Sequence, residues 1–164
     1  MIEILEMPEK EVVDVLARMN YGHFACSWND QPYVVPLNYV YDQPHILIYT
    51  TAGLKTEILK RNPLVCLQVE EIGETNWRSV VVTGSAEQIV DREEREKAVN
   101  LIRSTNPSLL PALALKWRND WLRKNVEMVY RIKIHTMTGL ASSEIRMAAA
   151  SARPVAAASD PRSA

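Results

Sequence analysis

The spacing of apolar residues changes from helical to strand-like after about the first twenty positions. Between Pro8 and Asn20, valine, leucine and methionine recur at near-helical intervals, which predicts a first helix. Pro8 suits a first helical turn, and Gly22 is expected to end this helix. Further along, runs rich in Val, Ile, Leu and Tyr lie between turn residues and predict strands. These runs cover residues 23–28, 33–41, 45–51, 64–70, 78–90 and 128–135.

Two strand-like runs contain residues that disturb a regular sheet. Pro36 cannot donate a backbone hydrogen bond, so its strand is expected to have an edge or a bulge there. Gly84 is a candidate bulge in the run over 78–90. Asp91 is a plausible N-cap for a following helix, with two glutamates in the first turn. The predicted helices after the first cover residues 55–61, 92–103 and 110–122.

The order of these elements favours a mostly β fold. Successive strands follow one another as hairpins, and the helical crossovers of a doubly wound parallel sheet do not recur between them. We therefore predict an antiparallel β-barrel with flanking helices, forming one domain over residues 1–147. From Ala148 the composition shifts to Ala, Ser, Pro and Arg, so residues 148–164 are predicted to be a disordered tail.

Composition narrows the classes of function. The 164 residues are 47% hydrophobic and 24% charged, with a formal net charge of -1, so no broad positive field attracts nucleic acid. No apolar run approaches the roughly 20 residues that span a bilayer, and the acidic start lacks a signal peptide's pattern, so we expect a cytoplasmic protein. The two cysteines and three histidines have no metal-binding spacing, so no metal site is predicted.

The stretch from Tyr49 to Lys55 carries the first chemical signal. Thr50, Thr51 and Gly53 lie where a strand gives way to a helix, and Lys55 follows in the first helical turn. A cation at the positive end of a helix dipole costs roughly 0.3–1 kcal/mol, and a bound phosphate would reverse that sign. The alternative is a Thr-Thr turn followed by a solvated lysine. The stretch lacks the glycines of a Walker loop or a dinucleotide fingerprint.

Three neighbouring segments bear on the choice between a phosphate site and a turn with a solvated lysine. They are Val34-Val35-Pro36-Leu37-Asn38-Tyr39-Val40-Tyr41-Asp42, Asn62-Pro63-Leu64-Val65-Cys66-Leu67 and Trp77-Arg78-Ser79-Val80-Val81-Val82-Thr83-Gly84. With the Thr-Thr stretch, their order and spacing resemble the FMN-binding split-barrel family related to pyridoxamine 5'-phosphate oxidase. The closest branch is that of flavin-nucleotide-binding, nitroimidazole-reductase-like proteins. The resemblance covers about residues 8–135.

The resemblance implies a six-stranded antiparallel split barrel that forms a homodimer with FMN at the interface. Thr50, Thr51 and Lys55 would then bind the FMN phosphate. Further implied flavin contacts come from Pro36, Leu37 and Asn38 beside the isoalloxazine ring, from Arg78 and Ser79, and from Trp77 as a wall. Which subunit supplies Arg78 and Ser79 stays open. Arg78 as an ordinary strand-end arginine and Asn38 as an outward polar residue are the alternatives.

Two departures from the family pattern bear on activity. The vitamin B6 oxidases bind substrate with an arginine and a histidine near the C-terminus, and residues 138–143 contain neither, so a typical pyridoxamine 5'-phosphate oxidase is not expected. Nitroimidazole-resistance relatives often carry a histidine in the strand before the phosphate motif, and residues 48–51 have none.

The resemblance favours an FMN-dependent oxidoreductase that acts on an unidentified small molecule, with NAD(P)H as a candidate electron donor. No side chain is assigned as a catalyst, since the flavin would carry the chemistry. The alternative is a non-enzymatic flavin- or haem-binding protein on the same barrel. A haem would need an axial ligand, for which the chain offers His23, His45 and His135.

Overall fold

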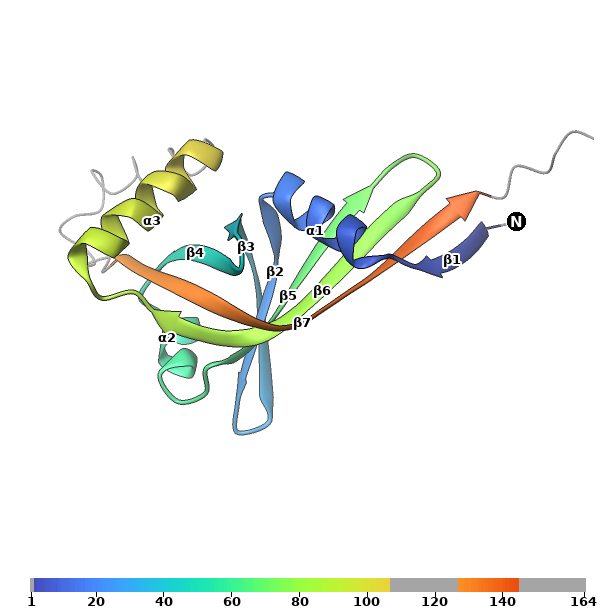
Figure 1. Ribbon diagram of the computed structural model, residues 1–164. Helices are drawn as coiled ribbons and strands as arrows, with labels where there is room; N and C mark the ends of the chain where they lie inside the picture. Colours follow the sequence, from blue (N-terminus) through green and yellow to red (C-terminus); the bar gives the residue numbers. More distant parts are fainter. Residues whose placement is uncertain (1, 107–126, 145–164) are drawn as a thin grey trace, which may run out of the picture.

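The computed structural model describes residues 2–106 and 127–144 (Figure 1). The helix predicted over 110–122 and the tail predicted over 148–164 lie outside these ranges. The elements follow the order β1 (Ile2–Glu6), α1 (Glu9–Arg18), β2 (Tyr21–Trp28), β3 (Gln31–Asp42), β4 (His45–Thr51), α2 (Leu54–Leu59), β5 (Leu64–Ile72), β6 (Trp77–Gln88), α3 (Arg92–Thr105) and β7 (Glu127–Glu144).

The strands form one antiparallel sheet that closes on itself. The sheet order is β1-β7-β4-β3-β2-β5-β6, and β6 also pairs with β7. The strands from β2 to β7 therefore close a six-stranded barrel, which confirms the predicted fold class. β1 is a seventh strand outside the ring and pairs with the far end of β7, from Ile2 opposite Glu144 to Glu6 opposite Leu140.

The barrel interior is filled by alternate residues of each strand. Phe24, Tyr39 and Ile46 are among the largest fully buried side chains of this core, and α1 adds Val12 and Leu16 from one side. The Tyr39 hydroxyl donates a hydrogen bond of 3.0 Å to the Leu16 carbonyl oxygen, so the helix is fixed to the barrel by a polar contact as well.

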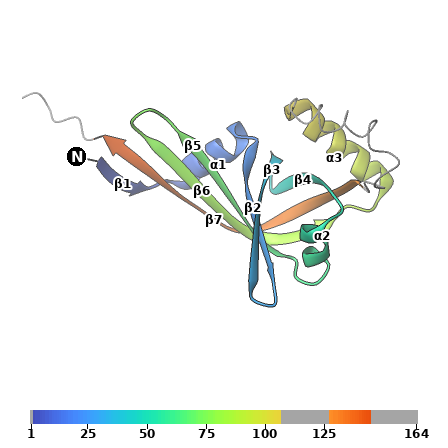
Figure 2. The same cartoon turned by 180° about the vertical axis from the view of Figure 1, so that it is seen from behind.

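A second, smaller core lies under α3. It is formed by the side chains of Val40, Leu47, Ile89, Ala98, Ile102 and Val129, which come from β3, β4, α3, β7 and the segment before α3. As predicted, Asp91 caps α3, because its carboxylate accepts a hydrogen bond of 2.9 Å from the Glu94 backbone N–H. α1 and α3 thus cover different parts of the sheet, as Figures 1 and 2 show from opposite sides.

Two expectations about the elements were wrong, and one strand was missed. Gly22 does not end the first helix: α1 ends at Arg18 because Met19 takes an extended backbone conformation, and Gly22 lies inside β2. β7 does not end near His135 but continues to Glu144. β1 was not predicted, since it pairs only with this continuation of β7.

In the part of the chain that the structure describes, no helix has both the length and the apolar character needed to cross a membrane.

Gly84 lies at a β-bulge, as predicted. Thr83 faces Thr136 and Gly84 faces Ile134, so His135 is the extra residue on β7. A Cβ atom at position 84 would lie 2.3 Å from the Lys133 carbonyl oxygen, so only glycine fits this close approach. Because a bulge bends its strand, the two halves of β7 run in different directions.

Candidate functional site

The barrel is split between β3 and β4. β4 pairs with β3 only from Tyr39, opposite Ile48, to Asp42, opposite His45. Beyond Ile48, the remainder of β4 continues its pairing with β7 alone, from Tyr49 to Thr51. The earlier part of β3 still pairs with β2 over its whole length. Pro36 therefore lies on a stretch of β3 with one open edge, as its missing N–H predicts.

The open edge of β3 offers backbone groups to a ligand. The Tyr39 N–H donates to the Asn20 carbonyl oxygen at 3.0 Å, which directs the backbone groups of Tyr39 and Leu37 toward β2. In an antiparallel strand, these directions alternate. The carbonyl of Pro36 and both backbone groups of Asn38 therefore face the split, where β4 no longer pairs with them.

The side chain of Asn38 has partners within the chain. Its amide nitrogen donates to the Asn20 carbonyl oxygen at 3.2 Å and to the Asn106 side-chain oxygen at 3.1 Å. Asn106 is fully buried at the end of α3 and donates in turn to the Tyr39 carbonyl oxygen at 3.2 Å. The side chain of Asn38 thus links β3 to α3, and its backbone is the part that faces the split.

Thr50 and Thr51 end β4 beside this split. The side chain of Thr50 is buried, whereas that of Thr51 is exposed. The loop that follows is held by Thr56, whose hydroxyl accepts from the Gly53 N–H at 2.9 Å and donates to the Gly53 carbonyl oxygen at 2.8 Å. Thr56 was not a predicted site residue; its hydroxyl occupies the position from which a Glu or Gln usually bonds the N-cap N–H.

Lys55 is a half-buried cation with no anionic partner among the described residues. The described carboxylates that form ion pairs do so with other basic residues. Burial lowers the pKa of Lys55 from its ordinary value, and the nearby Cys26 thiol opposes this shift. Burial likewise raises the pKa of Cys26, opposed by the charge of Lys55. A buried charge without a counter-charge is costly, so this position favours an anionic ligand.

The remaining predicted site residues lie at the other end of β7. Thr50 pairs with Met128 and Ser79 pairs with Leu140, so twelve residues of β7 separate them. Twelve positions span at most about 40 Å along a strand, and the bend at the bulge shortens this distance. Figure 1 shows β7 crossing the molecule between these positions. We call the region of Thr50, Thr51 and Lys55 the Lys55 end, and that of Trp77, Arg78 and Ser79 the Ser79 end.

At the Ser79 end, the predicted residues have partners within the chain. An Arg78 guanidinium nitrogen lies 3.5 Å from a carboxylate oxygen of Glu71, which also pairs with Arg18 at 2.8 Å. The Trp77 backbone N–H donates to the Ser142 hydroxyl at 2.9 Å. The structure therefore places Thr50 and Thr51 at the end of β4 and Lys55 in the following helix, with Pro36, Leu37 and Asn38 on the neighbouring β3. It leaves Trp77, Arg78 and Ser79 distant within one chain.

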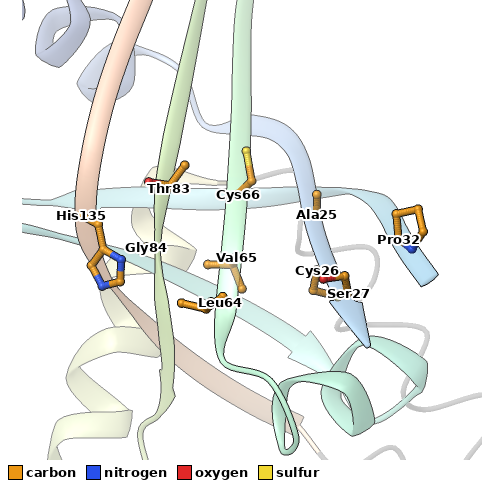
Figure 3. Close-up of a pocket in the computed structure, with 10 residues that line it drawn as sticks. All are labelled: Ala25, Cys26, Ser27, Pro32, Leu64, Val65, Cys66, Thr83, Gly84 and His135. Carbon is orange, nitrogen blue, oxygen red and sulfur yellow. The ribbon is translucent and has the colours of Figure 1, made fainter. Parts of the chain in front are cut away.

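An open, mostly apolar groove of about 470 Å³ lies across the strands (Figure 3). Its lining residues come from five strands and are Ala25, Cys26, Ser27, Pro32, Leu64, Val65, Cys66, Thr83, Gly84 and His135. None of them was a predicted flavin contact, although His135 was one of the three histidines considered as a haem ligand. Their small size could have indicated a surface that a flat molecule can approach, and the bulge brings His135 to its rim.

The chain has the architecture of a split-barrel protein, and comparison with known proteins defines its family. The model of the pyridoxamine 5'-phosphate oxidase family matches residues 8–141. The chain belongs to the pyridoxamine 5'-phosphate oxidase family.

Individual relatives agree with this assignment. A crystal structure of a FAD-binding protein from Mesorhizobium loti is 30% identical, with a TM-score of 0.71 over 88% of this chain and 100% of that one. A putative 5-nitroimidazole antibiotic resistance protein from Bacteroides thetaiotaomicron shares the fold at 18% identity, with a TM-score of 0.63 over 87% of this chain and 89% of that one. An uncharacterized protein of Rhizobium meliloti is 33% identical over 84 residues. That match spans 51% of this chain and 56% of the relative, so the chain covers about half of the relative's length.

Proposed function

We propose that this protein binds a flavin nucleotide, FMN, with the phosphate held at the Lys55 end. The observation that carries this proposal is the half-buried Lys55, which no described carboxylate neutralises and which follows, by a few residues, Thr50 and Thr51 at the end of β4. A phosphate would supply the missing negative charge and accept hydrogen bonds from the hydroxyls of these threonines. The relative from Mesorhizobium loti, named as FAD-binding, supports a flavin as the ligand.

The open edge of β3 fits the other part of such a ligand. The backbone groups of Pro36 and Asn38 that face the split would donate to and accept from the polar edge of the isoalloxazine ring. The chain's residues would bind and orient the flavin, which supplies redox chemistry when bound. We assign the protein as a flavin-dependent oxidoreductase of an unidentified small molecule, with NAD(P)H as the candidate electron donor.

The separation of the two ends supports a homodimer as the binding unit. If Arg78 and Ser79 contact the same flavin as Lys55, a second copy must supply them, since they lie at opposite ends of β7 within one chain. The outer face of β2, β5 and β6 suits such an interface because it carries mainly short or uncharged side chains. Those at its centre are His23, Ala25, Cys66, Gln68, Ser79, Val81 and Thr83.

The test is the absorbance spectrum of the full chain purified without added cofactor. We expect flavin bands, and chromatography of the released pigment should identify FMN rather than FAD. Mixing the colourless protein with each nucleotide then gives the two dissociation constants, and the molar mass in solution gives the oligomeric state. A haem Soret band, or no binding of either flavin, would overturn the proposal.

Reduction of the bound flavin tests the assignment as an enzyme separately. Anaerobic addition of NADPH or NADH should bleach the flavin bands. A flavin that no common donor reduces would instead favour a carrier or sensor, and flavin binding itself would stand.

A further inference from the structure

Polar side chains form a hydrogen-bonded row across the outer face of three strands. The His23 ring nitrogen Nδ1 on β2 lies 3.0 Å from the Gln68 side-chain oxygen on β5. The Gln68 amide nitrogen lies 3.2 Å from the Ser79 hydroxyl on β6. All three side chains are half-buried on the face that points away from the core. The row thus ends at Ser79, one of the residues that the resemblance assigns to the flavin.

The hydrogen-bonding partners of Gln68 determine which group donates and which accepts at each contact of the row. The Gln68 amide nitrogen also donates to a carboxylate oxygen of Glu70 at 3.2 Å. A carboxylate only accepts hydrogen bonds, so the reversed amide would put two acceptor oxygens against each other. The Gln68 oxygen therefore faces His23, and His23 must donate from Nδ1. The Tyr21 ring packs against the imidazole in a T-shaped arrangement, with the ring centroids 5.9 Å apart.

This arrangement leaves one hydrogen available at the end of the row. Both amide hydrogens of Gln68 are used, one on Glu70 and one on Ser79. Because the Ser79 oxygen accepts from Gln68, its own hydroxyl hydrogen is free to donate elsewhere. Because Gln68 occupies one acceptor site of the Ser79 oxygen, fewer directions remain for the hydroxyl hydrogen, which lowers the entropy cost when a ligand binds.

We propose that Gln68, oriented by Glu70 and His23, is a positioning residue that makes Ser79 a hydrogen-bond donor to the flavin ring. This inference rests on the flavin binding and the homodimer proposed above, in which Ser79 of one copy meets the flavin held at the Lys55 end of the other. Ser79 is the residue that contacts an acceptor atom of the ring, either a carbonyl oxygen or a ring nitrogen. Gln68 acts through Ser79 and does not touch the ligand.

The experiment measures FMN affinity and the flavin absorption bands in the full chain and in single and double variants. Ser79→Ala and Gln68→Met should each weaken FMN binding about threefold to tenfold, the value of one hydrogen bond. Both should move the flavin bands in the same direction. The double variant should be no weaker than the weaker single variant, since both changes remove the same donor. Ser79→Thr, which keeps the hydroxyl, should retain affinity and spectrum.

Controls separate this role from a structural one. Gln88→Met, at the exposed end of β6, should leave FMN binding unchanged. If Gln68→Met does not fold, Gln68→Glu keeps the shape of the side chain, and its carboxylate should draw the Ser79 hydrogen toward β5. We then expect it to reproduce the affinity loss of Ser79→Ala.

The outcomes distinguish this inference from the proposed function. Effects of Ser79 and Gln68 that multiply in the double variant, or a Gln68 variant with unaltered bands and affinity, would overturn the inference while flavin binding stands. A wild-type chain that binds no flavin would overturn both.

Discussion

The Lys55 end and the Ser79 end of β7 both carry a basic residue, but they treat its charge differently. At the Ser79 end, Arg78 and Arg18 share the carboxylate of Glu71 on the neighbouring strand, so both guanidinium groups have an anionic partner within the chain. At the Lys55 end, the half-buried ammonium has no described carboxylate partner, and burial lowers its pKa. A protein keeps such a charge where a ligand neutralises it.

The largest expected effect comes from reversing the charge at the Lys55 end. Lys55→Glu should raise the FMN dissociation constant more than tenfold while leaving the fold intact, because a carboxylate would repel the phosphate dianion. Fluorescence quenching of FMN measures the affinity, and far-UV circular dichroism checks the fold. Lys55→Met should fall between wild type and Lys55→Glu, since it removes the charge without repulsion.

Lys60 provides the matched control for this prediction. It lies at the end of the same helix, is exposed, and pairs with Glu57 at 2.7 Å. Lys60→Glu should change FMN affinity less than twofold. Equal effects at both lysines would mean that the overall field, and not a site at Lys55, attracts the ligand.

The second effect concerns the bulge that lies between the two ends. Gly84→Ala should lower the free energy of unfolding by about 1–3 kcal/mol, because its Cβ would lie 2.3 Å from the Lys133 carbonyl oxygen and force a backbone shift. Urea denaturation measures the change. Gly53→Ala is the control, since no atom lies within 4 Å of its Cβ and its φ of 172° is ordinary extended backbone. If both variants lost equal stability, the close approach at the bulge would not constrain β7.

The two ends also differ in how well the sequence predicted them. The strands around Lys55 are rich in β-branched residues, so their bounds were predicted within two residues, and Pro36 correctly indicated an open edge on β3. Near Ser79, the second half of β7 contains Gly139 and Ala141, two residue types that are depleted in strands. Its pairing with β1 and β6 forms the strand there.

Contacts between side chains on different strands could not be predicted from the sequence, for a physical reason. Gly139 packs under α1, where a Cβ would lie 2.9 Å from Val12, and no local pattern indicates such a contact. The row that links His23, Gln68 and Ser79 depends on the register of three strands, and register follows from the closed barrel. Propensity predicts which residues form strands, but not which side chains meet across them.

The smallest expected effect tests the ion pairs of Glu71 at the Ser79 end. Glu71 accepts hydrogen bonds from Arg18 and Arg78, and these partners hold its pKa below the ordinary value in the folded state. A depressed carboxyl pKa stabilises the fold at neutral pH, and this contribution disappears as the pH falls through the folded pKa.

Glu71→Gln should therefore lower the free energy of unfolding by about 0.2–1 kcal/mol at pH 7, a small effect because the ion pair is partly exposed. The cost should begin to shrink as the pH falls to the ordinary glutamate value of 4.5, and it should vanish only below the lower pKa of the folded state. Urea denaturation at neutral pH and below that folded pKa measures it, with Glu74→Gln in the exposed β5–β6 turn as control. A cost that persisted at low pH would show that Glu71 stabilises the fold through packing and not through its ion pairs with the two arginines.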